Sequence, residues 1–203
     1  MKKMIKLAGI VAVAVAMTQT LQAVPITGNI GFTGAVTFDT SSAATATQVT
    51  SWVSPTTVTL TSGAFTGLNG AIATFANAVW NFGGPLPGSG VGLPINNFWS
   101  VGGFTFNLLS SYVLSQGGTP GVNGFVVVDG TGVVSGPAGS NYDPTVFSWS
   151  FTSQDPAIAG ANGPSWTFSA SANPNGVPDG GTTVMLLGIA LAGAALLKKK
   201  LTA

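Results

Sequence analysis

Apolar and polar residues alternate in short segments spread along the middle of the chain. The segments with a clear period of two are Ile30–Phe38, Thr56–Thr61, Phe104–Leu108, Ser148–Thr152 and Ser165–Ser169. In the first of them, Phe32 and Phe38 fall on the same face. A period of two is typical of a β-strand with one buried face, and threonine suits the face that meets water. These segments are therefore predicted to be strands.

Two further segments need a local interpretation. Phe125–Val128 and Thr131–Val134 flank the dipeptide Asp129-Gly130, a pair that favours a tight two-residue hairpin turn. The stretch Leu68–Phe82 has a helix-like arrangement of apolar residues, but Gly70 and many β-favouring residues interrupt it. A hairpin is predicted for the first segment, and no helix is assigned to the second.

About eight to ten such strands, separated by turns rich in glycine, proline and asparagine, predict an all-β fold. Residues 24–176 are expected to form a single antiparallel β-sandwich or jelly-roll-like domain. The loop-like stretches Pro85–Gly90 and Gly160–Pro164 do not separate parts of different composition. This domain has no lysine with which to protect strand edges. Its edges are expected either to be covered or to support self-association.

The first 23 residues have the pattern of a secretory signal peptide. Lys2, Lys3 and Lys6 precede an apolar run from Leu7 to Met17, which is too short to span about 30 Å of hydrocarbon. Cleavage is predicted between Ala23 and Val24. Export through the Sec translocon follows from this interpretation.

The chain ends with a turn-prone peptide, an uncharged apolar segment and three basic residues. Val177-Pro178-Asp179-Gly180-Gly181 leads into Thr182–Leu197, and Lys198–Lys200 follow. The apolar segment is helix-compatible, and sixteen residues would cover about 24 Å. The lysines are expected on the cytoplasmic side, so residues 182–197 would hold the precursor in the inner membrane with residues 24–176 outside it.

This combination resembles the PEP-CTERM class of sorting signals, and most closely its VPDSG-CTERM variant. Val177, Pro178, Asp179 and Gly181 match the variant pattern, whereas Gly180 stands where that pattern has serine. The resemblance implies that a membrane-embedded exosortase recognises the motif and cuts near it, so that the apolar helix holds the protein only transiently. A permanent anchor, which would keep the protein periplasmic and membrane-attached, is the alternative.

The charges lie in separate parts of the chain. All six basic residues are lysines at the two ends, and residues 24–176 carry four aspartates and no positive charge. Binding to the phosphates of nucleic acid needs clustered basic residues, so no nucleic-acid partner is predicted. The sequence contains no Cys, His, Glu or Arg, which removes most metal-binding and nucleophile–base arrangements. No cofactor and no metal are predicted.

A few residues of the domain are candidates for chemistry or binding. Asp143 and Asp155 are the acids to consider for a hydrolase, although both lie in turn contexts, where structural roles are more common. Trp99 and Tyr142, flanked by Asn and Ser, are the aromatic residues best suited to stack against sugars. No run of acids typical of a calcium loop occurs.

The sequence therefore predicts an exported, non-enzymatic protein that an exosortase delivers to the cell surface or extracellular matrix. Its role is expected to be structural or adhesive, in biofilm, with exopolysaccharide or a second copy of the chain as partner. A carbohydrate-binding module of β-sandwich fold is one alternative. A hydrolase that uses Asp143 and Asp155 is the other.

Overall fold

The computed structural model describes residues 23–155 and 166–174. These residues form eleven strands and one short 3-10 turn, η1 (Gly63–Phe65). The strands are β1 (Val24–Pro25), β2 (Ile30–Phe38), β3 (Gln48–Thr61), β4 (Ile72–Phe75), β5 (Trp80–Asn81), β6 (Ile95–Val101), β7 (Phe104–Gly117), β8 (Phe125–Ser135), β9 (Tyr142–Asp143), β10 (Thr145–Gln154) and β11 (Trp166–Pro174). The predicted all-β class is confirmed.

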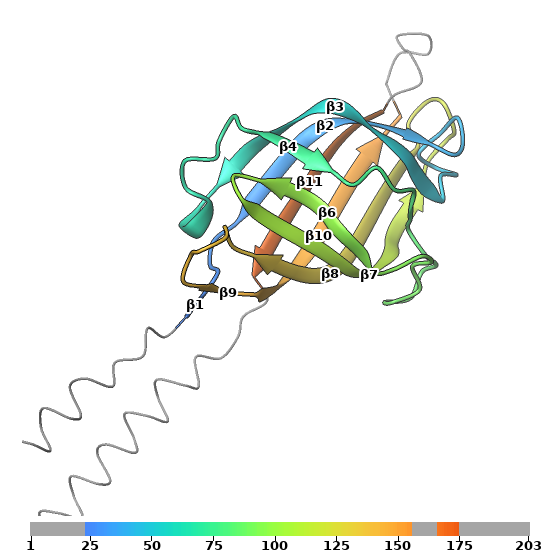
Figure 1. Ribbon diagram of the computed structural model, residues 1–203. Coiled ribbons are helices and arrows are strands. Elements are labelled where there is room, and N and C mark those ends of the chain that lie inside the picture. Colours follow the sequence, from blue (N-terminus) through green and yellow to red (C-terminus); the bar gives the residue numbers. More distant parts are fainter. Residues whose placement is uncertain (1–22, 156–165, 175–203) are drawn as a thin grey trace, which may run out of the picture.

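Eight of these strands form one sheet that closes on itself. Their order is β2-β11-β10-β8-β7-β6-β4-β3, and β3 pairs again with β2. All of these pairings are antiparallel. Figure 1 shows the strands wrapping around a common interior. The expected antiparallel pairing is confirmed, but the expected sandwich is corrected to a single barrel-like closed sheet.

Irregular pairing gives the sheet the curvature that closure needs. The register shifts at three places between β2 and β3, at one place between β6 and β7, and at two places between β7 and β8. Bulges of this kind bend a strand and increase its twist. Pro55 lies in β3 between Val53 and Thr57, where the register with β2 shifts. Proline has no N–H to donate to a ladder, so a shift in register is a suitable place for it.

The interior of the closed sheet is filled with aromatic side chains. The fully buried ones are Trp80, Trp99, Trp149, Phe32, Phe65, Phe82, Phe98, Phe106, Phe147 and Phe151. Trp52 stacks on Phe75 with their ring centroids 4.1 Å apart, and Trp80 donates its indole N–H to Ser111 Oγ at 3.2 Å. Large rings of this kind bury much apolar surface per residue. They explain how a domain without disulfides obtains its core.

The predicted hairpin at Asp129-Gly130 is wrong. Strand β8 runs straight through the dipeptide, and it pairs with β7 on one side and β10 on the other. Gly130 and Gly132 face the interior, where a Cβ atom on Gly130 would lie 2.4 Å from the carbonyl oxygen of Ser110. These glycines therefore allow close approach of neighbouring chain segments. They do not form a turn.

The segment from Leu68 to Phe82 contains β4 and β5 and no helix. Among residues 23–155 and 166–174, no helix is long and apolar enough to cross a membrane. The predicted sorting helix at 182–197 and the predicted loop at 160–164 lie outside the described residues. The predicted loop Pro85–Gly90 contains no strand.

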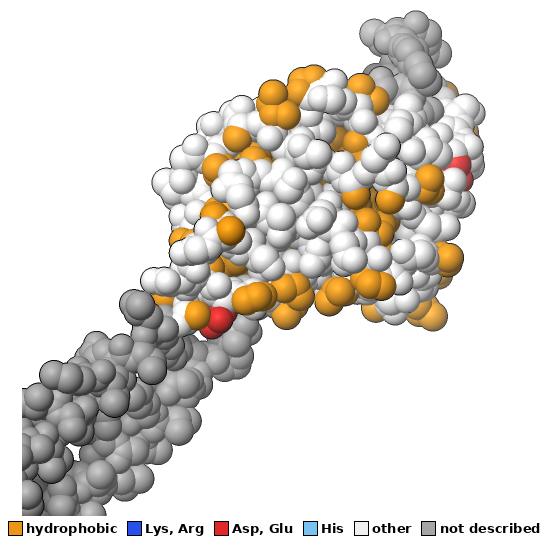
Figure 2. Space-filling view, viewed as in Figure 1, with side chains coloured by type: hydrophobic (Ala, Val, Ile, Leu, Met, Phe, Trp, Pro, Cys, Tyr) orange, Lys and Arg blue, Asp and Glu red, His pale blue; other side chains and the backbone are white. Residues whose placement is uncertain are grey.

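The surface of the described domain carries few charges. On the face that Figure 2 shows, orange side chains lie among white atoms and gather along the lower edge, red appears in two places, and no blue appears on the described part. Leu60, Ile72, Leu86 and Val91 are among the exposed apolar side chains. Closure pairs each of the eight strands on both sides over part of its length, which supports covered edges over open ones.

Candidate functional site

The two ends of the described domain leave it at the same place. Strand β1 pairs with β9, where Val24 lies opposite Tyr142. Strand β10 begins two residues after β9, and Pro174 at the end of β11 lies opposite Phe147 of β10. Figure 1 shows β1, β9, the start of β10 and the end of β11 at one end of the closed sheet, which we call the terminal pole. Val24, which follows the predicted signal cleavage, and Pro174, three residues before the predicted sorting motif, thus lie at the same end of the fold.

The predicted cleavage site for the signal peptide lies on the surface of this pole. Val24 is exposed, and its backbone N–H donates a hydrogen bond to the carbonyl oxygen of Asn141 at 2.8 Å. An α-amino group at Val24 would retain a donor for the same bond. The placement of Ala23 and Val24 fits the predicted cleavage, which stays a prediction. The motif residues Val177 to Gly181 lie outside the described residues.

Trp99 is not an exposed platform for a sugar. Its side chain is 0% exposed and lies between the rings of Phe32, at 5.1 Å, and Phe106, at 5.4 Å. The reason is an irregularity in β6 at Asn97, whose φ is +50°. Because of it, Phe98 and Trp99 are both buried although they are consecutive. The prediction of glycan contact at Trp99 is wrong.

Tyr142 is half-buried at the terminal pole, with its ring 5.9 Å from that of Phe104. Its pairing with Val24 places it beside the predicted cleavage site. Glycan contact at Tyr142 stays a prediction.

Asp143 and Asp155 do not form a pair. They lie at opposite ends of β10, which has ten residues and at about 3.3 Å per residue extends for about 30 Å. Two carboxyl groups that flank a glycosidic bond lie about 5 to 9.5 Å apart. Asp155 is instead a structural residue, because its carboxylate accepts hydrogen bonds from Ser42 Oγ at 2.5 Å, the Ala43 N–H at 2.7 Å and the Gly121 N–H at 2.8 Å. The predicted acid pair is corrected.

A polar hollow of about 240 Å³ lies on the outer face of the sheet, over β7, β8, β10 and β11. We call it the outer hollow. Its lining consists of Tyr112, Asp129, Gly130, Thr131, Ser148, Trp149, Ser150 and Asn173. The ladders explain the grouping, because Tyr112 lies opposite Asp129 and Asp129 lies opposite Ser150. Ser148 lies opposite both Thr131 and Asn173 in a second row.

The sequence did not single out the outer hollow. Tyr112 lies between two bulges of β7, at Leu108/Ser110 and at Val113/Ser115, and its partner Asp129 belongs to a dipeptide that favours a turn. The available signal was the aspartate itself, because aspartate is depleted in strands.

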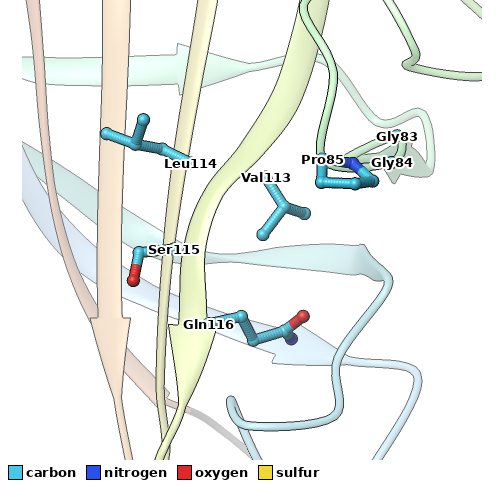
Figure 3. A pocket seen from close by; sticks show the side chains of 7 residues that line it. All are labelled: Gly83, Gly84, Pro85, Val113, Leu114, Ser115 and Gln116. Carbon is cyan, nitrogen blue, oxygen red and sulfur yellow. The ribbon is translucent and has the colours of Figure 1, made fainter.

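A second hollow of about 520 Å³ lies beside the last part of β7, just after Tyr112. It is lined by Gly83, Gly84, Pro85, Val113, Leu114, Ser115 and Gln116. In Figure 3, Val113 and Gln116 lie on the side of β7 that faces the loop at Pro85. The amide nitrogen of Gln116 donates hydrogen bonds within the fold, to the carbonyl oxygens of Ala43 and Ala46 at 2.9 and 2.7 Å. This hollow has no charged side chain among the residues that line it.

Among the described residues, no group of three or more Asp, Glu, His or Cys side chains is placed to hold a metal ion. The aspartates among the described residues lie apart from one another. Asp39 accepts hydrogen bonds from the Thr47 backbone N–H and hydroxyl at 3.0 and 2.5 Å, and so ties the loop that follows β2.

Comparison with known families assigns the end of the chain. Residues 176–201 match the family model of the VPDSG-CTERM motif. The chain carries a PEP-CTERM-type sorting signal. This VPDSG-CTERM signal begins two residues after the end of β11, and it makes the protein an exported one with an exosortase as its processing partner. No curated protein and no solved structure matches the chain.

Proposed function

We propose that this protein is a non-enzymatic component of the cell surface or extracellular matrix, released from the inner membrane by an exosortase and structural or adhesive in biofilm or exopolysaccharide. The observation that carries the proposal is the VPDSG-CTERM signal at residues 176–201. Signals of this kind are addresses, and a hydrophobic tail that serves as an address is removed.

The position of the terminal pole supports release from the membrane. Both chain ends leave the domain there, so a precursor held by one or both ends keeps the rest of the closed sheet away from the membrane. Val177 follows Pro174 by three residues, which span at most about 10 Å. The exosortase must therefore act close to the terminal pole.

Two features of the domain support a non-enzymatic role. Its interior is occupied by aromatic side chains, and its best acid pair is separated by the length of β10. The outer hollow favours the second candidate function, carbohydrate binding, because it combines a tyrosine, a carboxylate, hydroxyl groups and an amide.

The intact mass of the protein isolated from its own host, with both termini mapped, tests the proposal. We expect a chain that starts near Val24 and ends between Val177 and Gly181, in the extracellular or outer-surface fraction. Deletion of the exosortase should leave residues 182–203 on the protein and hold it in the inner membrane. A protein that keeps this tail while the exosortase is active would be an anchored periplasmic protein, and the proposal would be wrong.

A further inference from the structure

We propose that the outer hollow binds one sugar unit of a neutral polysaccharide, with Tyr112 contacting the face of the ring and Asp129 accepting hydrogen bonds from its hydroxyl groups. The inference rests on the proposed function and gives the adhesive role a site. It concerns residues that the sorting signal does not involve.

The position of Asp129 differs from those of Asp39 and Asp155. The carboxylates of Asp39 and Asp155 each accept several hydrogen bonds from loops. Asp129 lies in the middle of β8, between strands on both sides. Among the described residues, none donates a hydrogen bond to its carboxylate. Aspartate is unfavourable within strands. A half-buried carboxylate without a hydrogen-bond donor adds no stability to the fold. A ligand rich in hydroxyl groups would give it partners.

Tyr112 supplies the second half of the site. It stands directly opposite Asp129, a placement that brings two Cβ atoms to about 5 Å. The two bulges that flank it in β7 are of the kind that aim side chains at binding sites. A tyrosine ring offers an apolar face with a hydroxyl group at its edge. That combination suits a sugar, which has apolar C–H faces and hydroxyl groups around its rim.

The remaining lining consists of groups that both donate and accept hydrogen bonds. Thr131, Ser148 and Ser150 contribute hydroxyl groups, and Asn173 contributes an amide. One hydroxyl is held in place, since Ser110 Oγ and Thr131 Oγ1 lie 2.7 Å apart. A few polar groups converging beside an aromatic ring are the usual means of fixing a small ligand.

Charge and size narrow the class of ligand. Asp129 is the one charged group among the described residues that line the hollow, so an acidic polysaccharide would be repelled and a neutral one accepted. Calcium is not the expected ligand, because it prefers six to eight oxygen ligands with several carboxylates among them, and the described lining of the hollow has one carboxylate. The volume of about 240 Å³ is below that of ordinary small-molecule pockets. One unit of a long chain fits this size, and many copies on one polymer would add avidity.

The chain contains two tyrosines, Tyr112 and Tyr142, which makes a direct test possible. The full chain is produced with ¹³C-labelled tyrosine in detergent and titrated with cellohexaose, laminarihexaose, mannohexaose and xylohexaose. The ring signals are assigned with Tyr112→Phe and Tyr142→Phe. We expect at least one oligosaccharide to shift the Tyr112 signal in a saturable way and to leave the Tyr142 signal unchanged.

Matched variants give the second measurement. Tyr112→Ala and Asp129→Asn should each weaken binding about tenfold, which corresponds to 1.4 kcal/mol. Asp143→Asn changes the same residue type at the terminal pole and should leave affinity unchanged. Tyr142→Ala tests the sequence-based candidate for glycan contact, and a loss of affinity there in place of a loss at Tyr112 would contradict the assignment to the outer hollow. The proposal is wrong if none of the four sugars shifts Tyr112, if all variants bind alike, or if calcium chloride alone produces the shift. Sorting, measured by the termini, is expected to be normal in all variants, so failure of either proposal can be recognised separately.

Discussion

At the scale of single residues, the interior of the closed sheet determines where side chains must be absent. Gly132 of β8 faces inward, where a Cβ atom would lie 2.2 Å from the carbonyl oxygen of Asn107 and 2.5 Å from the ring of Phe106. The ring of Phe106 in turn stacks on Trp99. Glycine at this position thus makes room for the aromatic core.

Gly132→Ala should destabilise the domain by about 1 to 3 kcal/mol, because the added methyl group must displace either backbone or a packed ring. Thermal unfolding followed by circular dichroism measures the change. Gly117→Ala is the control, since a Cβ atom there meets the Phe125 ring at an ordinary 3.7 Å. A variant at Gly132 as stable as the one at Gly117 would show that the core has space to yield.

At the scale of elements, a single carboxylate joins three segments at the end of the sheet opposite the terminal pole. Asp155 follows β10 directly, and it holds Ser42 and Ala43 of the loop after β2 and Gly121 of the loop after β7. Its own N–H donates to the carbonyl oxygen of Gly124 at 2.7 Å. The loops at this end therefore depend on one another.

Asp155→Ala should lower the free energy of unfolding by about 3 kcal/mol or more, because buried N–H and O–H donors lose a charged acceptor. Urea denaturation of the variant and of the parent chain gives the difference. Asp143→Ala removes an exposed carboxylate and should stay within about 0.5 kcal/mol of the parent. Equal stabilities of the two variants would contradict the structural role assigned to Asp155.

The same scale shows how far the sequence alone could lead. Regular alternation placed Phe104, Phe106 and Leu108 on one face, and all three are buried. Alternation failed at Phe98 and Trp99, because the irregularity at Asn97 turns two consecutive rings inward. The turn signal of Asp129-Gly130 was misleading, because this pair lies inside a strand. Local patterns do not record bulges or the close approach of a distant segment.

At the scale of the whole molecule, closure depends on pairings between remote parts of the chain. Strand β2 pairs with β11, so that Val36 lies opposite Trp166, and their neighbours in sequence give no sign of it. The outer hollow depends on the same long-range order, because Tyr112 and Asn173 reach it from β7 and β11. The sorting signal, in contrast, is a continuous segment and could be recognised from its residues.

The distribution of lysine, together with the position of Val24, has a practical consequence. Between residues 7 and 197 the chain contains neither lysine nor arginine. If cutting occurs at the two predicted places, the product keeps a single primary amine, the α-amino group of Val24 at the terminal pole. An amine-reactive biotin ester should then add one label per molecule, as read by intact mass, and two or more labels would reveal a retained lysine tail. Every molecule captured through that label would stand on the support in one orientation, with the loops around Asp155 facing outward.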